Sequence, residues 1–332
     1  MADALSSADR PPARARATAV VAAVAVVAAV GIVALLLHER RVRADREEAR
    51  RSQWSIGIFE GPSPLQLGPA PSVTNPVLSS HDVTDVRAEF VADPFMLRRG
   101  PTWYLFFEVM DLGTKKGCIG VAKSADGRSF RYEHIVLREP FHLSYPYVFE
   151  DGSDVYMVPE TNEAGAVRLY RATRFPDQWT LDATLLSGKP FVDSSLVHYR
   201  DKWWMFTSTP ENSDLLLYFA DALRGPWTPH PASPIVRGNK RVSRPGGRVL
   251  AMDGHVLRFA QDDETSYGKR VYAFEIRRLD ETGFDEAPAV DGPVVGPSGS
   301  GWNSEKMHTV DAHPIAPDLW IACVDGKGPL PR

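Results

Sequence analysis

Residues 91–108 read VADPFMLRRGPTWYLFFE, and this stretch decides the fold. An Asp-Pro pair opens a short apolar run, RRGP follows, and a second run rich in aromatic residues ends in Glu108. Proline is tolerated at the first positions of a strand, and a Gly-Pro pair between two apolar runs is typical of a turn. The stretch therefore predicts two antiparallel strands, with Asp93 and Glu108 at the same end of the pair.

This pattern occurs five times along the chain. The first runs begin at Asp93, Tyr145, Asp193, Arg244 and His313, with spacings of 52, 48, 51 and 69 residues. The second runs read TWYLFFE, DVYMVPE, KWWMFTS, HVLRFAQ and LWIACVD. Most copies also offer a third and a fourth strand-like run, and four antiparallel strands make one propeller blade. We therefore predict an all-β fold, a five-bladed β-propeller over residues 77–326, preceded by one N-terminal transmembrane helix.

Residues 18–37, TAVVAAVAVVAAVGIVALLL, carry no charge and are long enough to cross a bilayer as a helix. A cleaved signal peptide is the alternative, but its apolar region would be shorter and followed by small residues. Here the charged run HERRVRADREEARR follows instead. We predict an uncleaved transmembrane helix, with residues 1–17 as an N-terminal tail, and hence a single-pass protein of the cell membrane.

The charges beside this span bear on its orientation. Three Arg residues precede the span and six follow it up to residue 51, and positively charged flanks tend to stay in the cytoplasm. This asymmetry favours a cytoplasmic propeller, although large domains can be exported whatever the flanking charge. Residues 38–76 are expected to be a charged and then Pro-rich linker, and residues 327–332 a C-terminal tail.

The bulk composition narrows the choice of partners and cofactors. The 332 residues carry a net charge of −4 and no basic patch stands out in the body of the chain, so we expect no nucleic-acid partner. Cys118 and Cys323 allow one disulfide, but two buried free thiols fit at least as well. Neither cysteine lies in a CxxC motif, and we expect no metal and no other cofactor.

Polar residues far apart in sequence are expected to meet at one mouth of the channel, because the first strand of each copy would line it. The candidates are Asp93, Glu108, His142, Tyr145, Glu160, Asp193, Arg244, His308 and Asp311. Carboxyl groups around a concave site suit glycoside hydrolysis, in which one group stays protonated as the acid while another stays ionised. We assign catalysis to Asp93, Glu160 and Asp193, and substrate binding to the other six.

Two other interpretations of these residues stay open. Glu108 and Glu160 occupy matching positions in their copies, so they could be a packing device of the repeat. His308, Asp311 and His313 could bind a metal ion and make the protein a metal-assisted hydrolase. Their spacing along a strand is a weak signature of a metal site.

Several segments resemble the N-terminal domain of plant glucosamine inositolphosphorylceramide transferases and its bacterial relatives. The segments that carry the resemblance include HLSYPYVFEDGSDVYMVPET (142–161) and MHTVDAHP (307–314), and it extends over about residues 85–326. The resemblance implies a five-bladed propeller similar to glycoside hydrolase family 43. In the plant proteins, glycosyl transfer is assigned to a separate C-terminal domain, so we do not expect transferase activity from this chain.

The resemblance to family 43 also implies roles for particular residues. Those enzymes use an Asp of the first blade as base, an Asp of the third blade to modulate pKa, and a Glu of the fourth blade as acid. Asp93 and Asp193 match the first two positions, whereas the fourth copy begins with Arg244 and has no Glu there. Glu160 of the second copy would have to supply the acid from another direction.

These observations predict a membrane-anchored, glycan-active propeller, most simply a glycoside hydrolase-like enzyme that uses carboxylates at the rim of the channel. The alternative is a non-catalytic carbohydrate-binding or scaffold module in envelope glycan or glycolipid synthesis. The expected partner is a glycan or a glycolipid in both cases. The geometry of the carboxyl groups separates the two, because carboxylates fully occupied by backbone hydrogen bonds would favour the binding module.

Overall fold

The computed structural model of the 332-residue chain describes residues 30–40, 52–252 and 254–330. The chain divides into two units, Met1–Arg51 and Ser52–Arg332. In the first unit, residues 30–40 are helical and their apolar side chains are exposed. Among the residues that the structure describes, no helix is long and apolar enough to cross a membrane. Residues 18–29 of the expected span lie outside the described residues, so the anchor stays a prediction.

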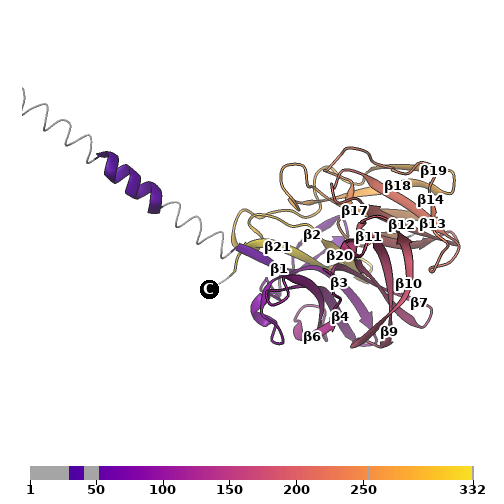
Figure 1. The fold of residues 1–332 in the computed structure, drawn as a ribbon, viewed down its shortest axis with the longest axis horizontal. Coiled ribbons are helices and arrows are strands. Elements are labelled where there is room, and N and C mark those ends of the chain that lie inside the picture. Colours follow the sequence, from indigo (N-terminus) through magenta and orange to yellow (C-terminus); the bar gives the residue numbers. More distant parts are fainter. Residues whose placement is uncertain (1–29, 41–51, 253, 331–332) are drawn as a thin grey trace, which may run out of the picture. The chain divides into compact units, whose positions relative to one another are not determined.

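The second unit is a five-bladed β-propeller, as the repeat predicts (Figure 1). Blade 1 contains β3 (Ala88–Arg99), β4 (Thr102–Asp111), β5 (Lys116–Ser124) and β6 (Arg131–Leu137), and blade 2 contains β7 (Ser144–Asp151), β8 (Asp154–Glu160), β9 (Ala166–Arg174) and β10 (Gln178–Ser187). Blade 3 contains β11 (Val192–Tyr199), β12 (Lys202–Ser208), β13 (Leu215–Ala220) and β14 (Thr228–Pro229).

The fourth blade has a divided first strand, and the fifth joins the two ends of the domain. Blade 4 contains β15 (Arg244–Pro245), β16 (Leu250–Met252), β17 (His255–Gln261), β18 (Val271–Asp280) and β19 (Gly283–Pro288), with β15 and β16 both paired to β17. Blade 5 contains β20 (Val310–Ala316), β21 (Leu319–Pro329), β1 (Ser52–Ser63) and β2 (Gln66–Pro69). Three short 3-10 helices, Ser80–Asp82, Asn162–Ala164 and Gly301–Asn303, lie in the connections.

The fifth blade corrects the predicted domain limits. Residues 52–69 were expected to lie in a linker, but β1 pairs with β21 continuously from Ser52 opposite Pro329 to Gly61 opposite Trp320. Figure 1 shows β1, in indigo, beside β21, in yellow. The physical reason is burial, because Ile56 and Ile58 of β1 are fully buried in the core. The prolines that suggest a linker lie at and beyond the ends of these two strands.

The second strand of each blade is buried along nearly its whole length. In β8, β12 and β17, six consecutive residues are buried after the first position. A strand packed between two neighbouring blades is covered on both faces, so it does not show the alternation of a half-buried strand. The aromatic side chains of WYLFF and KWWMF accordingly belong to the core, where Phe106, Phe107 and Trp204 are almost fully buried.

Three blades share a backbone irregularity at the same position of their first strand. Asp93, Tyr145 and Asp193 have φ angles of 51°, 45° and 45°, a region that residues other than glycine seldom occupy. The pairing register shifts at each of them, as it does in a β-bulge. A bulge re-aims a side chain, so the repeat places these three residues on the inner strands in a common local conformation.

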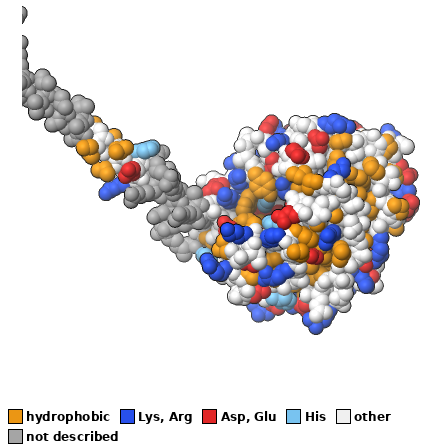
Figure 2. Space-filling model, in the orientation of Figure 1, with side chains coloured by type: hydrophobic (Ala, Val, Ile, Leu, Met, Phe, Trp, Pro, Cys, Tyr) orange, Lys and Arg blue, Asp and Glu red, His pale blue; other side chains and the backbone are white. Residues whose placement is uncertain are grey.

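The surface in view shows no segregation of charge by sign. Figure 2 shows Lys and Arg side chains interspersed with Asp and Glu side chains over the visible face of the propeller. This distribution agrees with the small net charge of −4.

Candidate acid–base site on the inner strands

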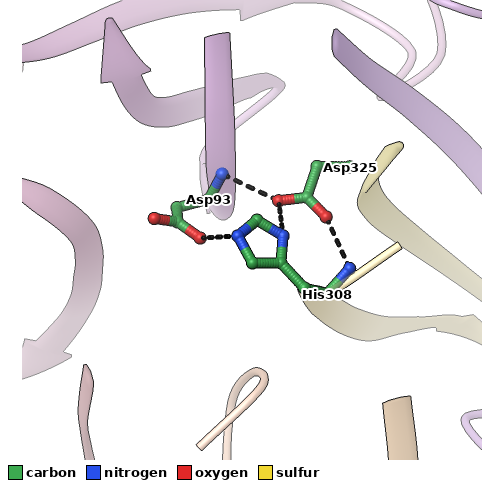
Figure 3. Close-up of side chains that lie close together, drawn as sticks. All are labelled: Asp93, His308 and Asp325. Atoms are coloured by element: carbon green, nitrogen blue, oxygen red, sulfur yellow. Dashed lines mark hydrogen bonds and ion pairs between the residues drawn. The ribbon is translucent and has the colours of Figure 1, made fainter. Parts of the chain in front are cut away.

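An imidazole between two carboxyl groups forms the first half of the site. Figure 3 shows His308 between Asp93 of β3 and Asp325 of β21. His308 Nδ1 lies 2.7 Å from Asp325 Oδ2, and His308 Nε2 lies 3.4 Å from Asp93 Oδ1. Asp325 also accepts hydrogen bonds from the backbone N–H groups of Asp93, His308 and Thr309, each at 3.0 Å. All three ionisable residues are buried, so Asp325 fixes the imidazole against Asp93.

Burial and neighbouring charges shift the pKa values of Asp93 and His308 in this half of the site. Burial raises the pKa of Asp93 to about 7, with the charge of His308 opposing the shift and the carboxylate of Asp193 adding to it. Burial alone would lower the pKa of His308, but the charges of Asp325 and Asp93 outweigh it and raise that pKa to about 9. At neutral pH, His308 is therefore an imidazolium beside a carboxyl group that is near its midpoint of titration.

The side chains around His308 come from segments far apart in sequence. The Trp54 ring of β1 stacks on the imidazole, with ring centroids 4.1 Å apart, and the Tyr267 ring meets it edge-on at 5.3 Å. Asp93, His308 and Asp325 each offer one potential metal ligand, all within 4.8 Å of one another. A metal ion would have to displace the proton from His308, because a metal-binding imidazole must be deprotonated.

The second half of the site is built around Arg244 at the start of β15. Its Nε lies 2.6 Å from Asp193 Oδ2, and its terminal nitrogens bond Glu160 Oε2 at 3.3 Å and Asn212 Oδ1 at 3.1 Å. Gln261 Nε2 donates to the same Asp193 oxygen at 2.6 Å. Among the described residues, no N–H group and no hydroxyl group donates to the other Asp193 oxygen, Oδ1. Arg244 and Gln261 thus hold the same oxygen of Asp193 from two directions.

Glu160 lies beside Asp193, and its pKa is raised. Burial raises the pKa of Glu160 well above its usual value, and the Asp193 carboxylate adds to the shift by its charge and by accepting a hydrogen bond. Arg244 opposes the shift but does not cancel it. The raised pKa favours the protonated form of Glu160, which is the form that a general acid needs.

A second histidine–carboxylate pair borders the site. His142 Nε2 lies 3.3 Å from Glu108 Oε1, and His142 Nδ1 accepts the N–H of Gly117 at 2.9 Å. Burial alone would lower the pKa of His142, but the hydrogen bond and charge of Glu108 raise it. Glu108 is itself buried, and its charge contributes to the raised pKa of Asp93.

The structure brings the two halves together. The pKa of Asp93 responds to the charge of Asp193, that of Glu160 responds to Asp93, and that of His308 responds to Asp193. A direct bond also links neighbouring blades, since Asp93 Oδ2 accepts the N–H of Tyr145 at 3.3 Å. Seven of the nine predicted residues therefore lie in or beside one buried cluster: Asp93, Glu108, His142, Glu160, Asp193, Arg244 and His308.

The Tyr145 hydroxyl has structural partners instead of a free face. It contacts Ser195 Oγ at 2.9 Å, donates to the carbonyl of Gly247 at 3.1 Å and accepts the N–H of Gly247 at 2.7 Å. Tyr145 is fully buried, so its hydroxyl joins the inner strands of blades 2 and 3 to Gly247 of blade 4.

Asp311 lies on β20 and belongs to an ion pair that is separate from the site. Its carboxylate lies 2.6 Å from Arg248 Nε, 2.9 Å from His313 Nε2 and 2.6 Å from the N–H of Met96. Burial would raise its pKa, but Arg248 and His313 hold the pKa well below its usual value. Asp311 therefore pairs with His313 and not with His308, which divides the trio considered as a metal site.

Asp325 and Gln261 are site residues that the sequence reasoning missed, although a signal for both was present. They end LWIACVD and HVLRFAQ, the repeat position that Glu108 and Glu160 occupy in the first two copies. Trp54 also contributes to the site, but it precedes the first repeat and its strand pairs with the last one. No pattern within the repeats could have indicated it.

Comparison with known proteins matches the chain to a protein family and to relatives from plants. The family "Glucosamine inositolphosphorylceramide transferase 1, N-terminal" matches residues 46–327. The rice relative (Oryza sativa subsp. japonica) named glucosamine inositolphosphorylceramide transferase 1 is 38% identical over 296 residues, which cover 82% of this chain and 40% of the relative. The Arabidopsis thaliana relative is 35% identical over 302 residues, covering 84% and 39%. The chain thus spans about two fifths of the length of these curated relatives.

Solved structures show the same fold at low sequence identity. The catalytic domain of Coprinopsis cinerea GH62 α-L-arabinofuranosidase superposes with a TM-score of 0.58 at 14% identity, covering 84% of this chain and 98% of that domain. A putative glycosidase from Bacteroides thetaiotaomicron superposes with a TM-score of 0.56 at 13% identity, covering 81% and 96%. The identities support a common fold and nothing finer.

Proposed function

The chain belongs to the family of glucosamine inositolphosphorylceramide transferase 1 N-terminal domains, and from this premise we propose that its propeller performs acid–base chemistry at a glycosidic bond. One observation carries the proposal. Two carboxyl groups with raised pKa values, Glu160 and Asp93, lie in the same buried site, and each has a different charged partner. Glycoside hydrolysis needs such a pair, one group to give a proton and one to take it.

Glu160 is the proton donor in this proposal. Burial and Asp193 raise its pKa, which favours the protonated form that a general acid needs. After it has protonated the leaving oxygen, Arg244 stabilises the new carboxylate through the contact of 3.3 Å to Oε2. Asp193 keeps the pKa of the acid high, and Arg244 and Gln261 hold Asp193 in place. Glu160 thus takes the role of the fourth-blade acid that this chain lacks.

Asp93 is the base in this proposal. With a pKa of about 7, it is substantially ionised at neutral pH and still basic enough to take a proton from water. The Thr309 hydroxyl donates to Asp93 Oδ1 at 2.9 Å and orients the carboxylate. The imidazolium of His308 lies against the same oxygen and favours the ionised form, while Asp325 holds the ring in place.

A glycan-binding or scaffold module remains the second candidate, and a specific observation favours it. Asp325 accepts three backbone N–H groups, and the buried Asp193 has one oxygen fully occupied by two donors. Carboxylates used in this way build a rigid polar site without performing chemistry. Such a module would bind a glycan or glycolipid headgroup and leave its bonds intact.

The ligand and the location are also proposals. The name of the plant relatives contains both glucosamine and inositolphosphorylceramide. We therefore propose a glycan or the headgroup of a glycolipid as the ligand. We further propose that residues 18–37 anchor the chain in the cell membrane, which would place the propeller near lipid-linked substrates. The distribution of Arg beside this span favours a cytoplasmic propeller.

The test is a hydrolysis screen with the full-length protein in a detergent without a sugar headgroup. The substrates are a panel of 4-nitrophenyl glycosides and oligosaccharides that includes glucosaminides, and the products are followed by absorbance and by chromatography. We expect release from at least one substrate by the wild-type protein and none by Glu160→Gln. Binding of a glycan without any release by the wild-type protein would replace the enzyme with the binding module.

A further inference from the structure

The loop 262–269, between β17 and β18, brings an exposed aromatic ring to the site. Tyr267 is 42% exposed. The Arg244 guanidinium carbon lies 5.2 Å from the centroid of its ring, and the His308 ring lies edge-on at 5.3 Å. Tyr267 therefore touches a residue from each half of the site while keeping part of its ring open to solvent.

This loop has a defined conformation, fixed by hydrogen bonds at its base and along its length. Asp262 and the residues 269–270 exchange two backbone hydrogen bonds of 2.8 and 2.9 Å. Lys306 Nζ donates to the carbonyl of Tyr267 at 2.8 Å. Gly268 has a φ of +65°, and a Cβ there would lie 2.9 Å from Cβ of His308. The close approach of loop and imidazole thus requires glycine at position 268.

Asp263 of the same loop is a buried acceptor with one unused oxygen. It is 8% exposed, and its Oδ1 accepts the N–H of Gly268 at 2.6 Å. Its Oδ2 is buried and has no hydrogen-bond partner among the described residues. Burial raises the pKa of Asp263, while the charges of Arg244 and His308 lower it. A charged residue from each half of the site therefore affects this carboxyl group.

We propose that the loop 262–269 is the sugar-recognition element of this site, in which Tyr267 stacks on a pyranose ring and Asp263 Oδ2 accepts a hydrogen bond from one of its hydroxyl groups. The proposal rests on the proposed function for the class of ligand, but it holds for an enzyme and for a binding module alike. It adds Tyr267 and Asp263 to the site as ligand-binding residues that take no part in the acid–base chemistry.

The chemistry of the two side chains suits this class of ligand. Binding sites for small molecules combine aromatic surface with a few placed polar groups that fix orientation. An exposed tyrosine alone is ordinary, because much of a protein surface is apolar. A buried carboxyl oxygen without a donor is costly, and a ligand hydroxyl would satisfy it. The two features occur on one short loop that contacts both halves of the site. The Tyr267 ring offers a face for stacking, and Asp263 Oδ2 offers an acceptor for a hydroxyl group.

The experiment measures binding and turnover on the same full-length samples. Methyl glycosides of glucose, galactose, mannose and glucosamine are tested by saturation-transfer NMR and titration, in a detergent without a sugar headgroup. The variants are Tyr267→Leu, Tyr267→Phe and Asp263→Asn. The control is Tyr199→Leu, which removes another partly exposed tyrosine that has an Arg over its ring, Arg200 at 5.1 Å, but lies outside the site.

The expected result is a graded loss of binding. Tyr267→Leu should bind about tenfold more weakly because the aromatic face is lost, whereas Tyr267→Phe should stay within about twofold. Asp263→Asn keeps the acceptor for Gly268 but loses Oδ2, and it should weaken binding by about three- to tenfold. Tyr199→Leu should match the wild-type protein. Because Tyr267 is exposed, its variants should keep the wild-type melting temperature.

Failure of this inference can be told apart from failure of the proposed function. Equal binding by the wild-type protein and Tyr267→Leu would overturn the role of the loop, even if Glu160-dependent turnover is found. Lack of binding of every methyl glycoside by the wild-type protein would overturn it as well. Binding that depends on Tyr267 and Asp263 in a protein that releases no product would support the loop and reject only the catalytic function.

Discussion

The backbone N–H of Asp93 donates a hydrogen bond of 3.0 Å to Oδ2 of Asp325, across 232 positions of sequence. This bond joins the first blade to the last. The same oxygen of Asp325 lies 2.7 Å from His308 Nδ1, so one buried carboxylate both connects the two blades and positions the imidazole that faces Asp93. The closure of the ring and the geometry of the site therefore depend on the same side chain.

Glu160→Gln is expected to abolish turnover and leave folding almost unchanged. Gln has nearly the volume of Glu, and it resembles the protonated form that the raised pKa of Glu160 favours. Removal of a general acid usually costs about 10²- to 10⁴-fold in rate. The unfolding free energy should change by less than about 1 kcal/mol, since Arg244 keeps Asp193 as its partner. Turnover is measured on a substrate from the screen, and stability by chemical denaturation.

The control for this variant is Glu150→Gln, at an exposed carboxylate that pairs with Arg99 on the surface. Its activity should equal that of the wild-type protein. Asp93→Asn should lose activity to the same extent as Glu160→Gln. If the domain only binds glycans, both site variants should instead weaken binding by about 1–3 kcal/mol, as expected for a poorly satisfied polar group. Full activity of both would remove these residues from the mechanism.

Tyr145→Phe is expected to destabilise the propeller without changing affinity for a glycan. The variant leaves the buried N–H of Gly247 without the acceptor that lies 2.7 Å away in the wild-type protein. A buried donor without a partner costs about 1–3 kcal/mol. The measurements are the unfolding free energy and the dissociation constant of a bound glycan. A large loss of affinity at unchanged stability would restore Tyr145 as a residue that binds substrate.

The protonated His308 should make stability fall with increasing pH between about 7.5 and 9. Its pKa is raised from 6.5 to about 9 in the folded protein, so the folded state keeps a proton that the unfolded state has already lost. This contribution is complete below pH 6.5 and disappears as pH rises through about 9. One such proton gives a slope of at most about 1.4 kcal/mol per pH unit. Denaturation curves at several pH values measure it.

His308→Gln should remove this slope, because glutamine has no proton to lose in that range. Asp325→Asn should reduce it, since the charge of Asp325 is the main cause that raises the pKa of His308. His198→Gln, at an exposed site on β11, should keep the wild-type slope. An unchanged slope in His308→Gln would show that another group titrates in this window.

The fold and half of the site follow from the sequence because a propeller repeats one simple rule. Strand ends at the same repeat position converge on the axis, so the positions of Asp93 and Asp193 in their copies were enough to bring them together. Glu160 ends the antiparallel partner of such a strand and returns to the same place. The aromatic runs identify second strands, because a strand covered on both faces needs large apolar side chains along its whole length.

The rest of the site depends on an offset in the fifth copy and on segments outside the repeats. The sequence pattern places the start of the fifth copy at His313, but its inner strand pairs Val310 with Val324, which brings His308 and Asp325 to the site. The spacing before this copy is 69 residues, because a 3-10 helix (Gly301–Asn303) is inserted there. The spacing therefore does not indicate that the inner strand begins before His313. Tyr267 lies in a loop and Trp54 in a strand from the opposite end of the domain, so no periodicity marks either of them.

A last prediction concerns β1 and β2, which close the ring without a covalent bond. A chain that begins at Ser52 should fold as the full-length chain does, because the two units of the structure divide there. A chain that begins at Ala70 lacks both strands, so β21 keeps only β20 as a partner and its other side becomes an exposed edge. It also loses the buried side chains of Ile56 and Ile58, each worth about 1.5–3 kcal/mol, against a total stability of typically 5–15 kcal/mol.

We expect this shorter chain to lose its cooperative melting transition and to aggregate on gel filtration. A synthetic peptide of residues 52–69 should restore the transition when it is added during refolding. A stable monomer that begins at Ala70 would show that four complete blades and half of the fifth are sufficient, and that β1 is an addition to the propeller instead of its closure.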